Sequence, residues 1–195
     1  MSILGALAGL YESMQASGDA PPPGYSMEKI GGEVVLDRGG NVLAIRDLRV
    51  PDERGKAQPR RMAVPAAVIR TAGKKPNHLW DKTAYVLGVT ALKDEKGKPQ
   101  RQDGEWIAGQ EKRTLAEHAA FVTTHEDQLA KAEDDGLRAL LAFLANWAPE
   151  DFARREFRPD LLDENLVFRL EGDIGPNGQP RFLHDRPAAR ALLAG

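Results

Sequence analysis

Hydrophobic periodicity changes character along the chain, and this change limits the possible fold class more than any other feature. The runs 33–36 (EVVL) and 42–45 (VLAI) flank a glycine-rich link at 37–41 (DRGGN). Apolar runs joined by such a link predict a β-hairpin. Residues 110–147 instead repeat apolar side chains at helical spacing. The sequence therefore predicts an α+β fold, in which an N-terminal helix and a helical hairpin pack against a small antiparallel sheet.

The predicted N-terminal helix carries one continuous apolar stripe. Ser2 is a suitable N-cap, and Gly18 and the run 21–24 (PPPG) end the helix. The stripe contains Ile3, Leu4, Leu7, Leu10, Tyr11 and Met14. Because amphipathic helices usually bury their apolar face, we expect the stripe to face the core. A surface for a partner protein is the alternative.

The second half of the chain is predicted to be mostly helical. Apolar faces over 110–134 and 137–147 are separated by Asp135-Gly136, which predicts an antiparallel helical hairpin. A last helix is expected over 187–193, with Asp185 as its N-cap. Further strands are predicted at 83–87, 165–170 and 181–183, and loops at 46–61 and 93–104.

Composition narrows the class of protein. The chain has 195 residues, of which 42% are hydrophobic and 29% charged, as is ordinary for one globular domain. These values exclude a mainly disordered, collagen-like or membrane-spanning protein. The absence of cysteine excludes disulfides, thiolate zinc sites and cysteine nucleophiles, and it suits a cytoplasmic protein. The N-terminus lacks a basic leader, so we expect no signal peptide and no membrane partner.

Charge is distributed unevenly, although the net charge is only -2. Residues 46–113 hold 16 basic and 9 acidic side chains, a net charge of +7. The segments 1–45 and 114–195 carry net charges of -3 and -6. This asymmetry indicates a middle segment that faces a polyanion. A solvated lysine-rich loop is the alternative interpretation.

The sequence offers little for catalysis. It contains no phosphate-binding GxxxxGK[ST] loop, no HExxH and no GxSxG. His118 and His125 share a helix face but lie two turns, about 10 Å, apart. The pair His184-Asp185 is reminiscent of HD-type metal-dependent phosphohydrolases, yet no aspartate follows it to complete such a site. We therefore expect no enzyme activity, no metal and no cofactor.

The segment 54–82 has the residue types that a nucleic-acid surface needs. Its basic side chains can each neutralise a phosphate; they are Arg54, Lys56, Arg60, Arg61, Arg70, Lys74, Lys75 and Lys82. Asn77 has a donor and an acceptor with which to read base edges, and Trp80 can stack on a base or act as a wedge. Both have a structural alternative, because Asn77 after a proline is typical of a turn and Trp80 before a predicted strand is typical of a core. A nucleic-acid-binding role requires that Lys74, Lys75 and Asn77 project together from an exposed loop beside Arg60 and Arg61.

Seven blocks of the chain resemble, in order, the large subunit of the subtype I-C CRISPR Cascade surveillance complex. They are ILGALAGLYES…PPPGYSMEKI, VVLDRGGNVLAIRDLR, RRMAVP, IRTAGKKPNHLWDKTAYVLGV, DGLRALLAFLANWAPE, ENLVFRLEGD and FLHDRPAARALL. The most specific block is GKKPNHLWDKTAYVLG. Members of this family are longer, so the resemblance implies that residues 1–195 form a single N-terminal DNA-recognition domain.

The resemblance implies a non-catalytic role in recognising target DNA. The large subunit lies at the 5′ handle of the crRNA, senses the protospacer-adjacent motif (PAM) on duplex DNA and helps to open the duplex. A helicase-nuclease is then recruited, so the implied partners are target DNA, crRNA, the other Cascade subunits and that enzyme. Protein reads a short motif while base pairing reads the remaining sequence. The resemblance points to the loop 73–77, with Arg60, Arg61 and Arg70, as the DNA contact.

An alternative function remains open on the sequence alone. The helix at 3–14, or the helices within 115–147, would dock neighbouring Cascade subunits. The basic loop would then be only a solvated surface, and the chain would be an interaction module without its own DNA readout.

Overall fold

A mixed sheet built around strand β12 is the centre of the fold. The computed structural model describes residues 2–16, 20–154 and 159–194. The helices are α1 (Ile3–Ala16), α2 (Thr83–Val86), α3 (Lys112–Leu129), α4 (Asp135–Asn146) and α5 (Pro187–Leu193), with 3-10 turns η1 (Pro149–Arg154), η2 (Pro159–Leu161) and η3 (Leu183–Asp185). The longer strands are β1 (Tyr25–Ile30), β2 (Gly32–Leu36), β3 (Val42–Asp47), β6 (Arg60–Pro65), β7 (Trp80–Lys82), β12 (Asn165–Ile174) and β13 (Pro180–Phe182). The two-residue strands are β4 (Val50–Pro51), β5 (Ala57–Gln58), β8 (Thr90–Ala91), β9 (Arg101–Gln102), β10 (Glu105–Trp106) and β11 (Ala108–Gly109).

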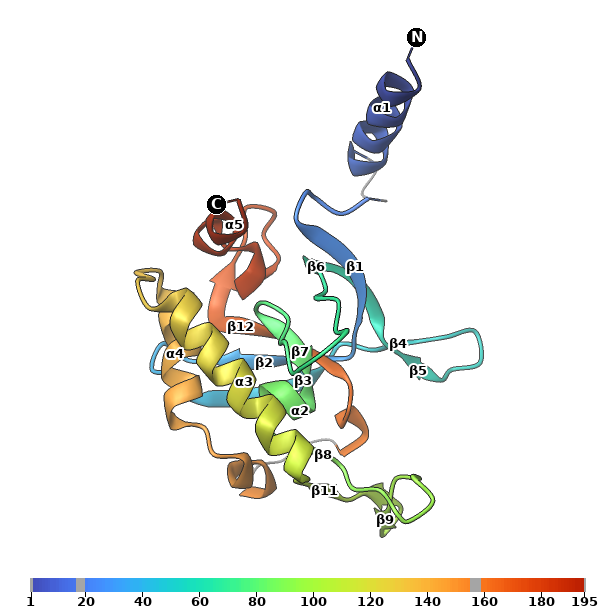
Figure 1. Ribbon diagram of the computed structural model, residues 1–195, viewed down its shortest axis with the longest axis vertical. Helices are drawn as coiled ribbons and strands as arrows, with labels where there is room; N and C mark the ends of the chain where they lie inside the picture. Colours follow the sequence, from blue (N-terminus) through green and yellow to red (C-terminus); the bar gives the residue numbers. More distant parts are fainter. Residues whose placement is uncertain (1, 17–19, 155–158, 195) are drawn as a thin grey trace.

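The sheet has the order β13-β12-β2-β3, and β7 also pairs with β12 (Figure 1). β2 and β3 form the predicted antiparallel hairpin. β12 and β13 are the strands predicted at 165–170 and 181–183. The α+β class is confirmed, and the sheet that was predicted to be antiparallel is mixed, because β2 and β12 run parallel while its other strand pairs are antiparallel. Pairing between strands so distant in the chain leaves no local signature in the sequence.

Alternating side chains of β12 separate two hydrophobic clusters. Leu166 and Phe168 pack with α2, α3 and α4, through residues such as Phe121 and Phe143. Val167 points to the opposite face and packs with Trp80 of β7 and with the β1–β6 ribbon. The predicted helical hairpin is therefore confirmed as α3 and α4, which lie side by side on the sheet (Figure 1).

Two segments predicted from short patterns adopt other structures. Residues 83–87 were expected to form a strand, but Thr83–Val86 is helix α2 and all four of its residues are buried. A short apolar run does not distinguish a buried strand from a buried helical turn. The predicted loop 46–61 includes the β4–β5 ribbon and the start of β6. Gly55 lies in the turn of that ribbon, whereas Pro51 belongs to β4 and Pro59 separates β5 from β6.

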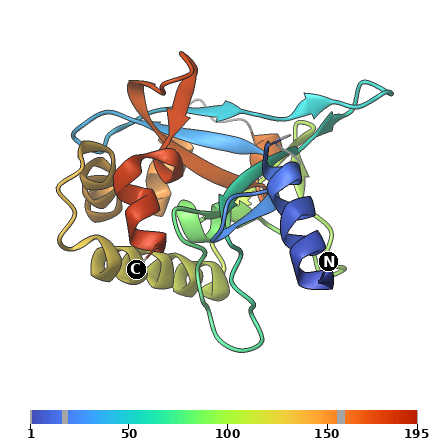
Figure 2. The ribbon, with the colours of Figure 1, turned by 90° about the horizontal axis from the view of Figure 1, so that it is seen from above.

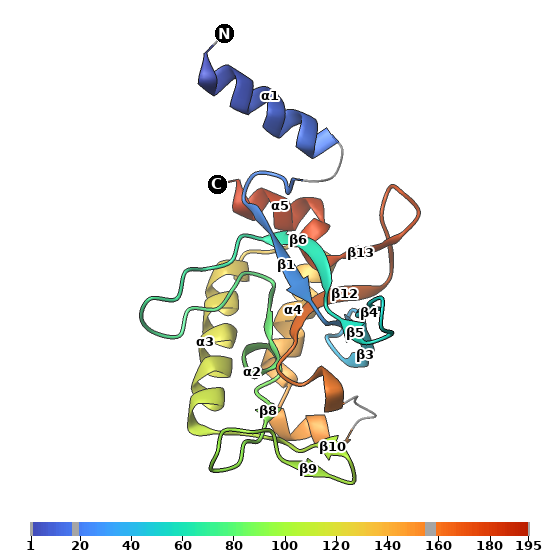
Figure 3. The same cartoon turned by 90° about the vertical axis from the view of Figure 1, so that its right-hand side faces the viewer.

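The N-terminal helix does not face the core as expected. α1 extends away from the sheet and the other helices (Figures 1 and 3). Its six apolar stripe residues are between 40% and 80% exposed. Periodicity correctly located the helix, but it reports only that one face is apolar and not what covers that face. Within the described residues, no helix has the length and apolar character needed to cross a membrane.

The cap predicted for the last helix was also wrong. Arg186 occupies the N-cap position of α5 and its side chain makes no cap hydrogen bond. Asp185 instead accepts a hydrogen bond from Arg190 Nη2 at 3.1 Å. Arg186 donates to Asp134, the N-cap of α4, at 2.9 Å, so this arginine ties the C-terminal helix to the helical hairpin.

The turn of the β2–β3 hairpin packs directly on α4. Gly40 has a φ of +80°, and a Cβ there would lie 2.4 Å from the amide nitrogen of Phe143. We expect Gly40→Ala to lower the free energy of unfolding by about 3 kcal/mol or more, because helix backbone cannot move aside cheaply. Denaturant titration measures this loss. The matched Gly39→Ala, whose Cβ would meet only side chains at 3.3 Å and beyond, should cost less than about 1 kcal/mol; equal losses would show that the turn does not pack as described.

Candidate nucleic-acid interface

A long basic loop between β6 and β7 projects from the body of the protein (Figures 2 and 3). It spans residues 66–79 and carries Lys74 and Lys75, both exposed, near its tip. Gly73 beside them has a φ of +77°, and a Cβ there would meet no atom within 4 Å. The loop also exposes an apolar side chain, Ile69, at 82%. Its tip therefore presents cations on an open surface.

A buried carboxylate fixes the shape of this loop. Asp81 of β7 has no solvent exposure. Its Oδ2 accepts hydrogen bonds from the backbone amide of Asn77, at 2.8 Å, and from Nη2 of Arg70. Its Oδ1 accepts from the amide of Lys82 at 2.9 Å. Burial raises the pKa of Asp81, while these donors act in the opposite direction. The carboxylate thus joins the start and the end of the loop.

Arg70 is part of the same clamp. Its Nε donates to the carbonyl of Lys75 at 2.8 Å, and its guanidinium lies 4.4 Å from the ring centroid of Tyr85. The side chain is 29% exposed. Nε and Nη2 of Arg70 thus position the basic loop. The phosphate contact that the sequence predicts for Arg70 would have to be made by its remaining donor, Nη1.

Asn77 and Trp80 have the structural roles that the sequence left as alternatives. Asn77 is 5% exposed, and its side-chain Oδ1 accepts a hydrogen bond from the amide of Val68 at 2.9 Å. Trp80 is 2% exposed and its Nε1 donates to the carbonyl of Pro65 at 2.8 Å. Neither side chain is presented to a base in this structure. The side-chain amide of Asn77 and the indole of Trp80 could recognise a base, but in this structure both groups make hydrogen bonds to the backbone.

His125 accepts a hydrogen bond from the backbone at the C-terminal end of the loop. Leu79 has a φ of 63°, and its amide donates to Nε2 of His125 at 2.9 Å. The other ring nitrogen of His125 faces the carbonyl of Phe121 at 2.8 Å, so it carries the proton. Burial lowers the pKa of His125 to about 4. The ring is neutral at physiological pH, as its acceptor role toward Leu79 requires.

Arg60 and Arg61 do not converge with the loop, contrary to the expectation from sequence. They begin β6 next to the β4–β5 ribbon, at the end of the strand that is far from residue 66. In Figures 2 and 3 that ribbon and the 66–79 loop extend in different directions from the body. Arg60 and Arg61 are therefore close to the 66–79 loop in the sequence but not in space.

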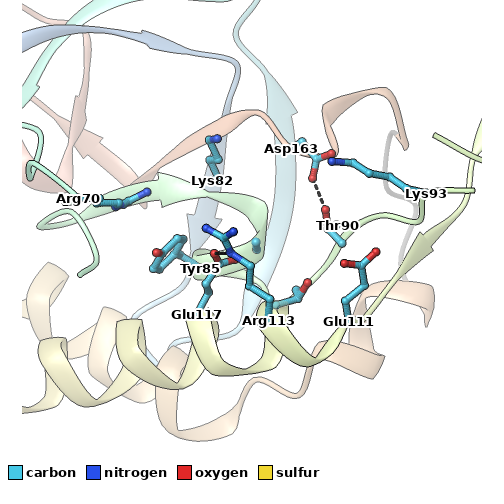
Figure 4. Close-up of a pocket in the computed structure, with 11 residues that line it drawn as sticks. Arg70, Lys82, Tyr85, Thr90, Lys93, Glu111, Arg113, Glu117 and Asp163 are labelled. Carbon is cyan, nitrogen blue, oxygen red and sulfur yellow. Dashed lines mark hydrogen bonds and ion pairs between the residues drawn. The ribbon is translucent and has the colours of Figure 1, made fainter. Parts of the chain in front are cut away.

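The loop instead adjoins cations of α3 and Lys93, which follows β8. A cleft of about 430 Å³ is lined by Arg70, Lys82, Tyr85, Thr90, Lys93, Glu111, Arg113, Glu117 and Asp163, among others (Figure 4). A second hollow, of about 540 Å³, is lined by Gly73, Lys74, Lys112, Arg113 and Ala116. Arg113 lines both hollows, so they adjoin. We call them together the α3 trough.

Three cations of the α3 trough lie outside the segment 54–82, although they belong to the basic segment 46–113. They are Lys93, Lys112 and Arg113. Lys112 and Arg113 open helix α3, whose first turn contains no acidic residue. Cations at this end of a helix oppose its dipole, so their placement carries a local electrostatic cost. Besides the charge excess of residues 46–113, this unfavourable placement is the sequence signal that points to Lys112 and Arg113.

The acidic side chains of the trough are largely occupied. Glu117 accepts a hydrogen bond from Arg113 at 2.7 Å. Asp163 accepts from the hydroxyl of Thr90 at 2.5 Å (Figure 4). Glu111 is exposed. Of the described residues that line the two hollows, six are cations and three are carboxylates, and this excess of positive charge suits an anionic ligand.

The His184-Asp185 pair, weighed in the sequence as a metal site, is arranged differently. His184 is fully buried and stacks on Phe182 with ring centroids 5.5 Å apart. Nε2 lies 3.6 Å from the carboxylate of Asp185, and neither ring nitrogen has a hydrogen-bond partner among the described residues. Within residues 2–16, 20–154 and 159–194, no cluster of three or more potential metal ligands occurs.

Comparison with known proteins gives the family. A family model described as CRISPR-associated protein (Cas_Csd1) matches residues 7–195. The chain belongs to the Cas_Csd1 family. This match confirms the resemblance to the large subunit of type I-C Cascade and makes the chain a CRISPR-associated Cascade subunit. No curated protein sequence matches it significantly.

The buried histidines predict how stability depends on pH. Burial lowers the pKa of both His125 and His184 to about 4, whereas an unfolded histidine titrates near 6.5. The unfolded state therefore binds protons first, and stability falls as pH decreases from about 6.5 to about 4. Each ring contributes roughly 1.4 kcal/mol per pH unit within this window.

His184→Phe tests this assignment, because Phe preserves the stacking on Phe182 and removes the titrating group. Denaturant unfolding between pH 4 and pH 7 gives the free energy of unfolding as a function of pH. In the variant this free energy should change less steeply with pH, by the contribution of one histidine, and it should be little lower than that of the unmodified chain at neutral pH. A slope equal to that of the unmodified chain would contradict the assignment.

Proposed function

We propose that this Cas_Csd1 chain binds duplex DNA through the 66–79 loop and recognises the protospacer-adjacent motif there. It would thereby initiate the unwinding that lets crRNA pair with its target. Its partners would be target DNA, the crRNA 5′ handle and the other Cascade subunits, with a helicase-nuclease recruited afterwards. The proposal includes a cytoplasmic, non-enzymatic role without metal or cofactor.

The observation that carries the proposal is a loop that is held by internal hydrogen bonds and exposes two lysines. Lys74 and Lys75 lie at an exposed tip whose two ends are held by Asp81. A loop ordered before binding loses less conformational entropy when it meets its ligand. Lysines at such a tip neutralise phosphates and release counterions. The resemblance to type I-C large subunits is what suggests duplex DNA as the ligand.

The unwinding role needs a side chain that can enter the base stack. Trp80 is buried, but Ile69 in the same loop is 82% exposed. Apolar wedges of this size separate base steps in proteins that kink DNA. Ile69 therefore replaces Trp80 as our candidate wedge.

Removing the two tip lysines tests the loop. Lys74→Ala with Lys75→Ala should weaken duplex binding across all sequences. The slope of log K against log salt should fall by about 0.9 for each phosphate that is no longer neutralised, or about 1.8 in all. Fluorescence anisotropy over a salt series measures both quantities.

The matched control is Lys131→Ala with Arg138→Ala, which removes two exposed cations where α3 meets α4. It should leave the slope unchanged. An unchanged slope in the loop variant would remove the loop from the DNA interface. Selection from duplexes with a short randomised window then reports whether the chain prefers a motif.

A second candidate function rests on α1. Its stripe residues are largely exposed, as the alternative role of docking neighbouring subunits requires. Membership in a Cascade subunit family implies such neighbours. This role is compatible with DNA binding, because α1 and the loop are separate parts of the molecule (Figure 3).

Charges placed in the α1 stripe test this role. Leu7 and Leu10 are 55% and 57% exposed, so Leu7→Glu with Leu10→Glu should leave the melting temperature within about 2 °C of the unmodified chain. The double variant should fail to co-purify with the other Cascade subunits. Glu12→Gln is the control on the same helix. Normal assembly of the double variant would exclude the stripe as a docking surface.

A further inference from the structure

A second basic surface lies on the β4–β5 ribbon and on the ends of the strands that adjoin it. In Figures 1 and 2 this ribbon projects from the body of the protein, away from the 66–79 loop. The cations of this surface are all exposed, and no described residue makes a hydrogen bond or ion pair with their side chains. They are Lys29, Arg46, Arg54, Lys56, Arg60 and Arg61. We call the ribbon and these six residues together the basic arm.

Two cations at the base of the arm face each other across a strand pair. Lys29 of β1 lies directly opposite Arg61 of β6, and both are exposed. Like charges at such positions destabilise a sheet. Among the described residues, no carboxylate pairs with either side chain to offset the repulsion. A placement that breaks a local preference without a structural gain indicates a functional surface.

Arg46 extends this charge onto the central sheet. It lies opposite Glu33 of β2, but the Glu33 carboxylate accepts two hydrogen bonds from Arg169, at 3.0 and 3.1 Å. Arg46 is therefore left exposed beside an acidic residue that is already paired. The carbonyl of Gly31, which precedes β2, accepts a hydrogen bond at 2.9 Å from the amide of Leu48, just after β3. The end of β3 thus lies against the junction of β1 and β2, and Arg46 adjoins the base of the arm.

The tip of the arm is shaped by a carboxylate. Oδ1 of Asp52 accepts hydrogen bonds from the amides of Arg54 and Lys56, at 2.9 and 2.8 Å. Between them, Gly55 has a φ of +75°, and a Cβ there would meet no atom within 4 Å. These bonds fix the turn, while the side chains of Arg54 and Lys56 remain exposed. Glu53 beside them is exposed as well, and its charge opposes an anionic ligand.

The composition of the arm favours a nucleic acid over a protein as its ligand. Residues 50–61 contain no aromatic residue, and Val50, which is 46% exposed, is their only large hydrophobic. Protein interfaces bury aromatic and apolar anchors at their centre, whereas nucleic-acid interfaces are polar and strongly basic. Because the arm has no aromatic ring on which bases could stack, it suits a duplex better than a single strand. A two-stranded β-ribbon also fits the major groove of B-DNA.

We infer that the basic arm binds the backbone of duplex DNA at a place separate from the 66–79 loop. Basic side chains on a ribbon in a groove meet the phosphates that line it, and such contacts position a protein without reading sequence. The inference goes beyond the proposed function, because it needs no contact at the loop. The arm and the loop extend in different directions (Figures 2 and 3), so we expect one short duplex to occupy only one of them.

The test titrates the whole chain with a fluorescein-labelled GC-rich duplex of about 11 base pairs, roughly one helical turn. Sedimentation and anisotropy give the number of duplexes bound and their affinities, and we expect two per chain. Arg54→Ala with Lys56→Ala should weaken one of them and lower its salt slope by about 0.9 for each phosphate left unneutralised, or about 1.8 in all. Lys74→Ala with Lys75→Ala should weaken the other. Lys131→Ala with Arg138→Ala should affect neither.

Two further variants are expected to produce gains, which misfolding cannot do. Glu53→Gln removes the negative charge at the tip, so binding at the arm should tighten roughly two- to fivefold. Arg61→Thr removes the charge opposite Lys29 and keeps a residue that favours strands. Its melting temperature should rise by about 1–3 °C while binding at the arm weakens. A lower melting temperature would show that Arg61 serves the fold and not a ligand.

The number of duplexes separates this inference from the proposed function. One duplex per chain, with an affinity that the Arg54 and Lys56 variant leaves unchanged, would overturn the arm and leave the loop intact. Two duplexes, of which the Lys74 and Lys75 variant weakens neither, would support the arm and remove the loop. One duplex that both variants weaken would show that arm and loop share a single DNA and would overturn a separate site. No binding at all would overturn both proposals.

Discussion

The buried carboxylate of Asp81 is the interaction on which the interface depends. A carboxylate without solvent needs donors to offset its desolvation, and here they come from Arg70, Asn77 and Lys82. These donors belong to the start of the basic loop, its end and the wall of the adjoining trough. One acceptor therefore fixes the loop and the trough relative to each other. Removing one partner of such a buried charge typically costs about 3–5 kcal/mol, so the arrangement is strongly held.

In this region the carboxylates make hydrogen bonds within the protein, whereas the lysines are exposed to solvent. The carboxylates of Asp81, Glu117 and Asp163 each accept a hydrogen bond within the protein. The lysines beside them are left exposed, and Lys112 is placed at the helix end where its charge is unfavourable. Sites that break a local preference without a structural gain are expected to be functional. The repulsion among these cations is therefore an argument for an anionic ligand.

The sequence predicted where the helices and strands lie more accurately than it predicted which parts of the protein they pack against. A glycine-rich link between two apolar runs located β2 and β3 correctly, and helical spacing located α3 and α4 because one face of each helix is buried. The same logic failed for α1, since periodicity does not say what covers an apolar face, and for α2, since a buried run of four residues has no period. The same distinction applies to the residues of the candidate nucleic-acid interface. Lys74 and Lys75 are exposed as predicted, but burial of Asn77 and Trp80 and the separation of Arg60 and Arg61 from the loop depend on tertiary contacts.

The two kinds of basic side chain have different tasks here. Arg70 and Arg113 have planar guanidinium groups that hold fixed acceptors, namely Asp81 with the Lys75 carbonyl, and Glu117. Lys74, Lys75, Lys82 and Lys112 are point charges on flexible stems, which suit phosphates. Such a stem has no fixed direction of its own, so a lysine reads a base edge only when the backbone that carries it is held in place. The hydrogen bonds of Asp81 that hold the loop are therefore what a preference for one DNA motif, as we propose it, would depend on.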